Sequence, residues 1–531
     1  ERIKEQLIQE YEELEEHQKE LGKVESKLAR KEPRLEKQNE RIEARKEREE
    51  RYQDKFGKPF HPLAGFAARM LMSVRTISGT YSQNDGMILP GFNEEAVLFG
   101  TNSTMIGDSR MRGFTIGNQQ RDVFGRENGF LMAPYAGERG YIVDTSGLNR
   151  QHTVIHAQNY NLRASLEPLK DLKIDLTMNR NFTQNSSEFF RFSDSLQAFE
   201  SQSQFVSTTV TYSTISIGSA FEKLGDEYRS PSFDRLLDRR AEISTFLGEG
   251  NPNSLSDSAG FYDGYGPSHQ DVLIGAFLNT FMGTKTNKKS ISPIRNIPLP
   301  NWQISYNGLS KFKAFQNLLS NFTLRHGYTS GVTVGGMQTN LNAEEDGAGN
   351  LTARDMNNNF ISRQQIQNVT IAERFSPLIG FDATWRIGGN GLITKFEYSK
   401  ERSSALSLAN NQITEMTGSE IVIGLGYKFS NVSLPISFQG QRIRPSDLNI
   451  RFDLSVRDNL TVIRKIVEDQ TQATAGQKVF SIRSSVDYLI GRNITVSLYY
   501  DQQLNTPVIA TSYVTGNINS GIRLRFNLGG L

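Results

Sequence analysis

The sequence LNIRFDLSVR, residues 448–457, decides the fold class. Apolar and polar residues alternate strictly along it, and successive side chains of an extended strand point to opposite faces. One face then carries Leu448, Ile450, Phe452, Leu454 and Val456, and the other carries Asn449, Arg451, Asp453, Ser455 and Arg457. This stretch therefore predicts a β-strand with one apolar face and one charged face.

The same period of two recurs through the second half of the chain. The clearest repeats are residues 381–387, 392–398, 421–429, 480–490, 494–500 and 518–528, with less regular copies at 152–166, 171–182, 204–221 and 320–329. Together they predict an all-β, antiparallel protein with roughly a dozen to fifteen strands of about nine to thirteen residues each.

The apolar faces of these strands contain almost no charge, and aromatic residues stand near several strand ends. A strand that crosses hydrocarbon needs about 9–11 residues and an apolar outward face, with aromatic residues at headgroup level. Phe429, Tyr500 and Phe526 fit that placement. The pattern predicts a transmembrane β-barrel wall of a bacterial outer membrane rather than a soluble sandwich.

Two sets of residues carry this prediction. The lipid-facing set is Ile450, Phe452, Leu454, Leu524 and Phe526, and the lumen-facing set is Asn449, Arg451, Asp453, Arg457, Arg523 and Arg525. Charged residues in a lumen stay hydrated and give a passing solute no apolar surface. They also pair with one another across strands, and both roles are compatible with the sequence.

The last strand carries a more specific pattern. Asn519, Gly521, Leu524 and Phe526 fit polar-x-Gly-x-x-apolar-x-aromatic, which resembles the C-terminal signal by which outer-membrane barrels are recognised for assembly. The alternative is the last strand of any β-protein.

Helical spacing interrupts the strands at 232–247 and 271–282. Val272, Ile274 and Phe277 belong to a set that nearly encircles the second helix, so it is expected to be buried. Together with Trp302, this segment is predicted to form lumenal or cap structure.

Turns and loops are expected between the strands. Residues 388–391 and 491–493 read as tight hairpins, because glycine and asparagine tolerate positive φ. Residues 465–477 and 503–516 read as long polar connections, and the glycine-rich residues 331–350 read as a mobile loop.

Residues 1–56 differ in composition and mark a boundary. They hold 15 Lys and Arg and 17 Asp and Glu, and leucine or isoleucine recurs every seven residues from Leu7 to Ile42. The companion apolar stripe of a coiled coil is mostly absent, and Pro33 interrupts a helix. The prediction is a charged helical arm that binds a partner, or a solvated spacer, followed by the β-domain at 57–531.

Composition excludes other classes of function. A net charge of +2 gives no sign of the basic surface that binds nucleic acid. The chain has no cysteine, which excludes disulfides, thiolate chemistry and cysteine-based zinc sites. Nucleotide-binding, hydrolase and metal-ligand motifs are lacking, so we expect no enzyme activity, no catalytic residues, no metal and no cofactor.

Several phrases carry a family resemblance. They are LPGF at 89–92, the run at 162–192, HQDVLI at 269–274, IPLPNWQISYNGLSK at 297–311, RFSPLIGFDATW at 374–385, SEIVIGLGYKF at 419–429, the run at 448–466, AGQKVFSIRSSVDYLI at 475–490 and NTPVIATSY at 505–513. Over about residues 57–531 the chain resembles the C-terminal part of the SprA/Sov family, the outer-membrane translocon of the Bacteroidota type IX secretion system, also called the gliding-motility cell-surface protein.

The resemblance implies a protein-conducting wall. Members form one very large barrel, and the family is the one to which we assign the largest known barrel, of about 36 strands. The resemblance implies these partners: folded cargo with C-terminal secretion signals, a PorV-like barrel protein at a lateral opening, a plug protein at the periplasmic end, outer-membrane lipid, and the remaining N-terminal part of the same translocon. Residues 1–56 fall outside the resemblance and are expected on the periplasmic side.

Two other readings stay open at this point. One is a self-contained porin of about fourteen strands for small solutes, and the other is a soluble β-rich surface or adhesion protein.

Overall fold

The computed structural model describes residues 14–15, 18–23, 40–48, 73–93, 95, 107–115, 132–255, 257–258, 260–287, 291–387, 391–433, 435, 437–438, 441–442, 445–490, 494–509 and 512–526. The chain divides into two compact units, Glu1–Met72 and Ser73–Leu531. In the first unit the described segments are helical, and Leu14, Leu21 and Ile42 of the predicted stripe are exposed. The rest of the predicted arm lies outside the described residues.

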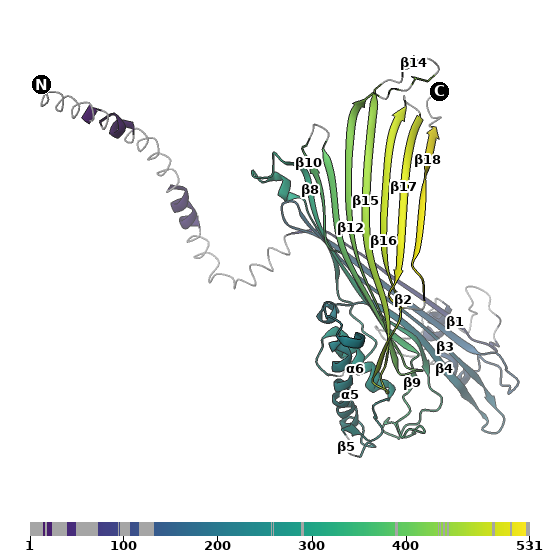
Figure 1. The fold of residues 1–531 in the computed structure, drawn as a ribbon. Helices are drawn as coiled ribbons and strands as arrows, with labels where there is room; N and C mark the ends of the chain where they lie inside the picture. The colour runs from purple at the N-terminus through teal and green to yellow at the C-terminus, as the bar shows by residue number, and fades with distance from the viewer. Residues whose placement is uncertain are drawn as a thin grey trace, which may run out of the picture. The chain divides into compact units, whose positions relative to one another are not determined.

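The second unit is built on one 14-stranded sheet in which every pair is antiparallel. Its strands are β1 (Val74–Ile88), β2 (His152–Leu169), β3 (Leu172–Ser193), β4 (Ala198–Ser213), β7 (Asn301–Tyr306), β8 (Leu319–Thr339), β9 (Gln364–Gln365), β10 (Asn368–Trp385), β11 (Leu392–Ser407), β12 (Gln412–Val432), β15 (Ser446–Lys465), β16 (Gln470–Ile490), β17 (Ile494–Pro507) and β18 (Thr515–Phe526). The twelve long strands lie side by side in the order in which they follow one another in the chain (Figure 1). The short β7 pairs with β3 and β8, and the short β9 pairs with β8. The predicted antiparallel β architecture is confirmed.

Smaller elements lie in the connections. They are the helices α3 (Ser109–Thr115), α4 (Met132–Glu138), α5 (Pro231–Glu249) and α6 (Gln270–Met282), three short 3-10 turns (Ile217–Ser219, Asp226–Tyr228 and Gly308–Lys311), and the two-residue hairpins β5 (Asp257–Ser258) with β6 (Phe261–Tyr262) and β13 (Ser437–Phe438) with β14 (Gln441–Arg442).

Three predicted loops are strands in part. The connection expected at 503–516 is shorter than predicted, because β17 continues to Pro507 and β18 begins at Thr515. The glycine-rich prediction at 331–350 is wrong for its first part, since β8 continues to Thr339. At Gly331 a Cβ would lie 3.3 Å from the backbone oxygen of Tyr212, so glycine serves a close approach between strands rather than a loop. The long connection expected at 465–477 is also wrong, because β16 begins at Gln470 and only four residues separate it from β15.

The rest of the 331–350 segment is held by local hydrogen bonds. The Asp346 carboxylate accepts the backbone N–H groups of Ala348 and Asn350 and the side-chain amide of Asn253. The hydrogen bond from the backbone of Asn350 is the largest cause that lowers the pKa of Asp346 to about 2. Asp355 repeats the turn, accepting from the backbone of Asn357 and Asn359.

One strand of the sheet is broken by an insertion. Strand β4 pairs with β3 up to Tyr212 opposite Arg180, and β7 resumes the pairing with Asn301 opposite Thr177. Both also pair with β8, so β4 and β7 occupy one column of the sheet. The chain leaves this column after Ser213 and returns at Asn301, and the intervening residues carry α5 and α6. We call residues 214–300 the insertion.

The two helices of the insertion form at the predicted places. Ser230 caps α5 by accepting the N–H of Phe233, and Pro231 follows at the first helical position. Helix α6 ends at Gly283, whose left-handed φ of 64° suits glycine. A Cβ at Gly275 would lie 2.9 Å from the Ile243 side chain, so the lack of a side chain lets α5 and α6 approach closely.

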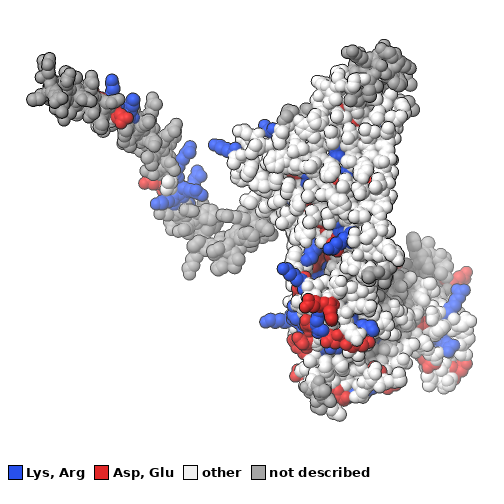
Figure 2. Space-filling view, in the orientation of Figure 1, with Lys and Arg blue, Asp and Glu red and all other residues white. Residues whose placement is uncertain are grey.

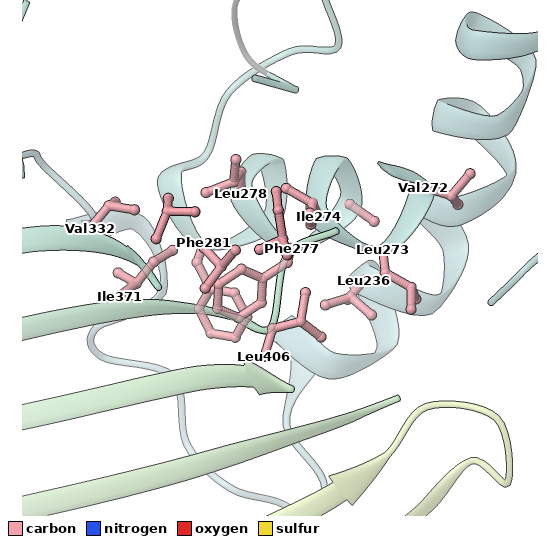
Figure 3. Packing of buried hydrophobic residues seen from close by; sticks show 14 of the residues in the cluster. Leu236, Val272, Leu273, Ile274, Phe277, Leu278, Phe281, Val332, Ile371 and Leu406 are labelled. Atoms are coloured by element: carbon pink, nitrogen blue, oxygen red, sulfur yellow. The ribbon is translucent and has the colours of Figure 1, made fainter. Parts of the chain in front are cut away.

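Helix α6 is the centre of the main core. All residues from Val272 to Phe281 are buried, as the all-round apolar pattern predicts. Figure 3 shows Phe277 and Phe281 projecting from α6 toward sheet residues that include Val332, Ile371 and Leu406. The core thus joins the insertion to the sheet.

Removing a core side chain should loosen the insertion. Phe277 is fully buried, so Phe277→Ala is expected to lower the free energy of local unfolding of α5 and α6 by about 3–5 kcal/mol. Native-state hydrogen exchange of α5 and α6 amides measures this loss. Phe246→Ala on α5, where the side chain is 36% exposed, is the control and should cost clearly less. Equal losses would contradict the packing described here.

Candidate functional site

The strand register defines two faces of the sheet. Residues that pair across antiparallel strands point to the same face. Ile450 on β15 pairs with Tyr427 on β12 and Val486 on β16, and Val486 pairs in turn with Leu498 on β17. A face can therefore be followed from β8 to β18.

One face carries an uncharged belt of residues that we call the apolar band. Its members are Phe322 and Leu324 on β8; Ile379, Phe381, Ala383 and Trp385 on β10; Leu392, Thr394, Phe396 and Tyr398 on β11; Ile421, Ile423, Leu425, Tyr427 and Phe429 on β12; Leu448, Ile450, Phe452, Leu454 and Val456 on β15; Phe480, Ile482, Ser484, Val486 and Tyr488 on β16; Ile494, Val496, Leu498, Tyr500, Gln502 and Leu504 on β17; and Gly516, Ile518, Ser520, Ile522, Leu524 and Phe526 on β18. None of them is Lys, Arg, Asp or Glu. Many of the large side chains are at least a third exposed, including Ile450, Phe452 and Leu524.

The dimensions of the band match a membrane. From Leu448 to Val456 it covers nine residues of β15. At a rise of about 3.3 Å per residue this is about 30 Å of strand, and a tilt of about 40° gives a height close to the roughly 25 Å of outer-membrane barrels. Aromatic residues mark its two ends: Trp385, Phe429, Tyr488 and Phe526 at one, and Tyr398 and Phe480 at the other. Tyr500, which the sequence placed near a strand end, is instead level with Phe452 in the middle of the band. Figure 2 shows few charges on the sheet above the helices.

The opposite, polar face carries Asn449, Arg451, Asp453 and Arg457 on β15. Positive and negative side chains are interleaved across its strands. Arg325 contacts Asp382 at 2.6 Å and Glu397 at 2.8 Å, and Arg457 contacts Glu401 at 3.0 Å. The cross-strand pairing expected for lumenal charges is therefore present at Arg457.

Small residues hollow the polar face beside these ion pairs. Gly331, Ala372, Ser403 and Gly418 take part in lining a depression of about 650 Å³. Arg374, Glu401 and Arg457 also line it, and Glu401 lies between the two arginines, 3.8 Å from Arg374. The depression thus combines charges of both signs with apolar groups, which include Met416 and Leu460.

Strand β18 places the predicted assembly pattern on both faces. Leu524 and Phe526 pair with Val496 and Ile494 in the band. On the polar face, Arg523 lies 5.3 Å above the Tyr499 ring, and Gly521 pairs with Tyr499. A Cβ at Gly521 would come within 2.8 Å of the Tyr499 hydroxyl, so the glycine makes room for that ring.

The insertion packs on the same face as the apolar band. Along β11 the register is continuous, and Phe396 of the band is ten residues from Leu406 of the core, so both point the same way. The insertion therefore lies on the face that the sequence predicts to meet lipid, and not on the face of Arg451. The lumenal or cap position of Val272, Ile274 and Phe277 stays a prediction.

Trp302 belongs to β7 of the sheet itself, so the prediction that it forms part of a separate cap or lumenal segment is wrong. Its ring stacks 4.5 Å from that of Tyr328, on the face of the insertion. The sequence does not reveal the face on which Trp302 lies, because that face depends on how β7 pairs with β3 and β8.

Two buried ion pairs lie in the sheet, and their arginines also bind the insertion. Arg402 contacts Glu373 at 3.1 Å and donates to the backbone oxygen of Ser219. Arg464 contacts Glu415 at 2.8 Å and donates to the backbone oxygen of Tyr228. Sequence reasoning missed these four residues, although they stand in phase with the band residues of their strands.

Comparisons with known proteins leave the family open. No family model matches the chain, and no curated protein matches it. Among the described residues, no helix is both long and apolar enough to cross a membrane. The class of the protein therefore rests on the two-faced sheet.

Breaking a buried ion pair should lower the free energy of unfolding far more than breaking an exposed ion pair. Glu415→Gln leaves Arg464, 1% exposed, without its charged partner, and about 3–5 kcal/mol of stability should be lost. Glu401→Gln removes a partner from the exposed Arg457 and should cost about 1 kcal/mol or less. Urea unfolding of the detergent-solubilised protein compares them. Similar losses would show that Arg464 is not buried in this contact.

Proposed function

We propose that the chain forms part of the wall of a protein-conducting translocon in the bacterial outer membrane, of the SprA/Sov type, which passes folded cargo in type IX secretion and gliding motility. The observation that carries the proposal is the uncharged apolar band, which stays in register across eight strands while the opposite face stays charged. A soluble sheet has no need of an exposed, continuous apolar band of this height.

The topology supports an orientation across the membrane. Strands β10 and β16 end where β1 begins and β18 ends, and only six and three residues lead on to β11 and β17. Residues 388–390 and 491–493 of the two predicted hairpins lie outside the described residues. Strands β1 and β8 end at the opposite end of the sheet, and the long stretches 89–151 and 340–367 follow them in the chain. Bacterial barrels keep short turns on the periplasmic side and longer loops outside. The periplasmic location expected for residues 1–56 belongs to this proposal.

The sheet edges support a larger assembly. Among the described residues, β1 pairs only with β2 and β18 only with β17, so each has one unpaired edge. In hydrocarbon, unpaired backbone groups cost several kcal/mol each, so a membrane wall must continue on both sides. This favours further strands from the N-terminal part of the same translocon over a self-contained porin.

The polar face suits folded cargo. A wide lumen requires many strands, and hydrated charges of both signs leave cargo no apolar surface on which to adhere. The PorV-like partner at a lateral opening and the plug protein at the periplasmic end follow from the family resemblance. They belong to this proposal.

Labelling of single cysteines tests the orientation. The chain has no cysteine, so each substitution gives one reactive site. Phe452→Cys and Leu524→Cys should react with a lipid-soluble maleimide in membranes and resist a charged one. Their neighbours Arg451→Cys and Arg525→Cys should show the reverse, by at least about tenfold. The opposite pattern would invert the wall and end the translocon proposal.

Removing charge from the polar face should slow transport. The triple variant Arg451→Leu, Asp453→Leu, Arg457→Leu offers cargo an apolar patch, so secretion should fall severalfold and cargo should accumulate in the periplasm. The matched control changes the band on the same strand: Ile450→Leu, Leu454→Ile, Val456→Ile. Quantification of secreted cargo, at equal translocon levels, decides. Unchanged secretion in the polar-face variant would contradict a cargo-contacting role.

A further inference from the structure

The apolar band ends on a row of charges. Lys400 pairs with Ser419, Ser419 with Asp458, and Asp458 with Lys478. This row lies two residues beyond Tyr398, or about 7 Å along the strand. It holds the first charges that a molecule in contact with the band would meet on this side.

The insertion encloses a hollow above this row. The hollow measures about 270 Å³ and lies between the wall and the insertion. Its lining includes Tyr398, Lys400, Ser419 and Asp458 from the wall and Ala220, Glu222, Leu224 and Ser230 from the insertion. One wall of the hollow is thus polar and continues directly into the band.

Phe221 marks the border between the hollow and the band. Its ring is half exposed, lies 5.1 Å from the Phe375 ring, and has the Lys400 ammonium 5.0 Å from its centroid. Aromatic rings beside lysine side chains are typical of the headgroup level of a membrane. Tyr398 adds a second aromatic group at the same level.

Among the described residues, the charged side chains around the hollow form ion pairs, with one lysine as the exception. Arg402 is occupied by Glu373, and the carboxylates of Glu222 and Glu415 are occupied by Arg235 and Arg464. Asp458 lies 3.8 Å from Lys478. Among the residues that the structure describes, Lys400 is the cation of this lining with no carboxylate within 4.0 Å.

We propose that this hollow binds the phosphate group of a membrane lipid, with Lys400 as its main contact. The acyl chains of such a lipid would run along Tyr398, Ile421 and Val456 of the band, while Phe221 lies beside its headgroup. Attraction between a lysine and an anionic lipid surface is worth about 1 kcal/mol, and partial enclosure strengthens it. This inference rests on the proposed membrane placement of the band.

Lipid titration tests the site directly. The delipidated protein is titrated with dioctanoyl phosphatidic acid, with dioctanoyl glycerol, which has the same chains and no phosphate, and with inorganic phosphate. Native mass spectrometry counts the bound molecules. We expect retention of phosphatidic acid alone, about a tenfold weaker affinity in Lys400→Gln, and recovery in Lys400→Arg.

A control variant and a second readout separate the possible failures. Lys285→Gln makes the same charge change on an exposed part of the insertion and should bind like the unsubstituted protein. Equal binding by Lys400→Gln and Lys285→Gln, or inorganic phosphate binding as tightly as the lipid, would overturn the lipid site. Quenching of Trp385 fluorescence by brominated lipid, in a Trp302→Phe background, tests whether the band contacts lipid. If Trp385 is quenched but lipid binding does not depend on Lys400, the lipid site is rejected and the membrane placement of the band is kept.

Discussion

A slip of one residue between β12 and β15 would exchange the two faces of β15. The pairing runs without interruption from Phe429 opposite Leu448 to Gln412 opposite Lys465. Side chains alternate with a period of two, so a slip would bring Arg451, Asp453 and Arg457 into the apolar band. An arginine or lysine at the middle of a bilayer costs about 2–4 kcal/mol, so several such charges would outweigh any local gain. The proposed wall depends on this register.

The irregularity in the middle of β10 preserves that parity. Between Phe375 and Ile379, β10 advances four residues while β11 advances two, so both sides change by an even number. Phe381 and Ile371 therefore still share a face, although they lie on opposite sides of the irregularity. The same face can then be apolar and bare over one length of the strands and covered by the insertion over the rest.

The part of this face that the insertion covers differs in charge from the band. Where the face is bare, its residues are uncharged; where the insertion covers it, Arg402 and Arg464 are buried with Glu373 and Glu415 as partners. Each arginine also binds a backbone oxygen of the insertion. Because a buried charge is tolerated only when it is paired, the positions of these charges mark where bare sheet ends and covered sheet begins.

The sequence by itself determined most of the strands, their two faces and the two helices of the insertion. Local alternation at 448–457 and the all-round apolar pattern of 271–282 are each sufficient, because side-chain direction follows from the backbone period alone. Only the tertiary structure decided that β4 and β7 form one broken strand, that the insertion shares its face with Phe396, and that Gly331 belongs to a strand. These features depend on pairing between residues far apart in the chain, which no local pattern encodes.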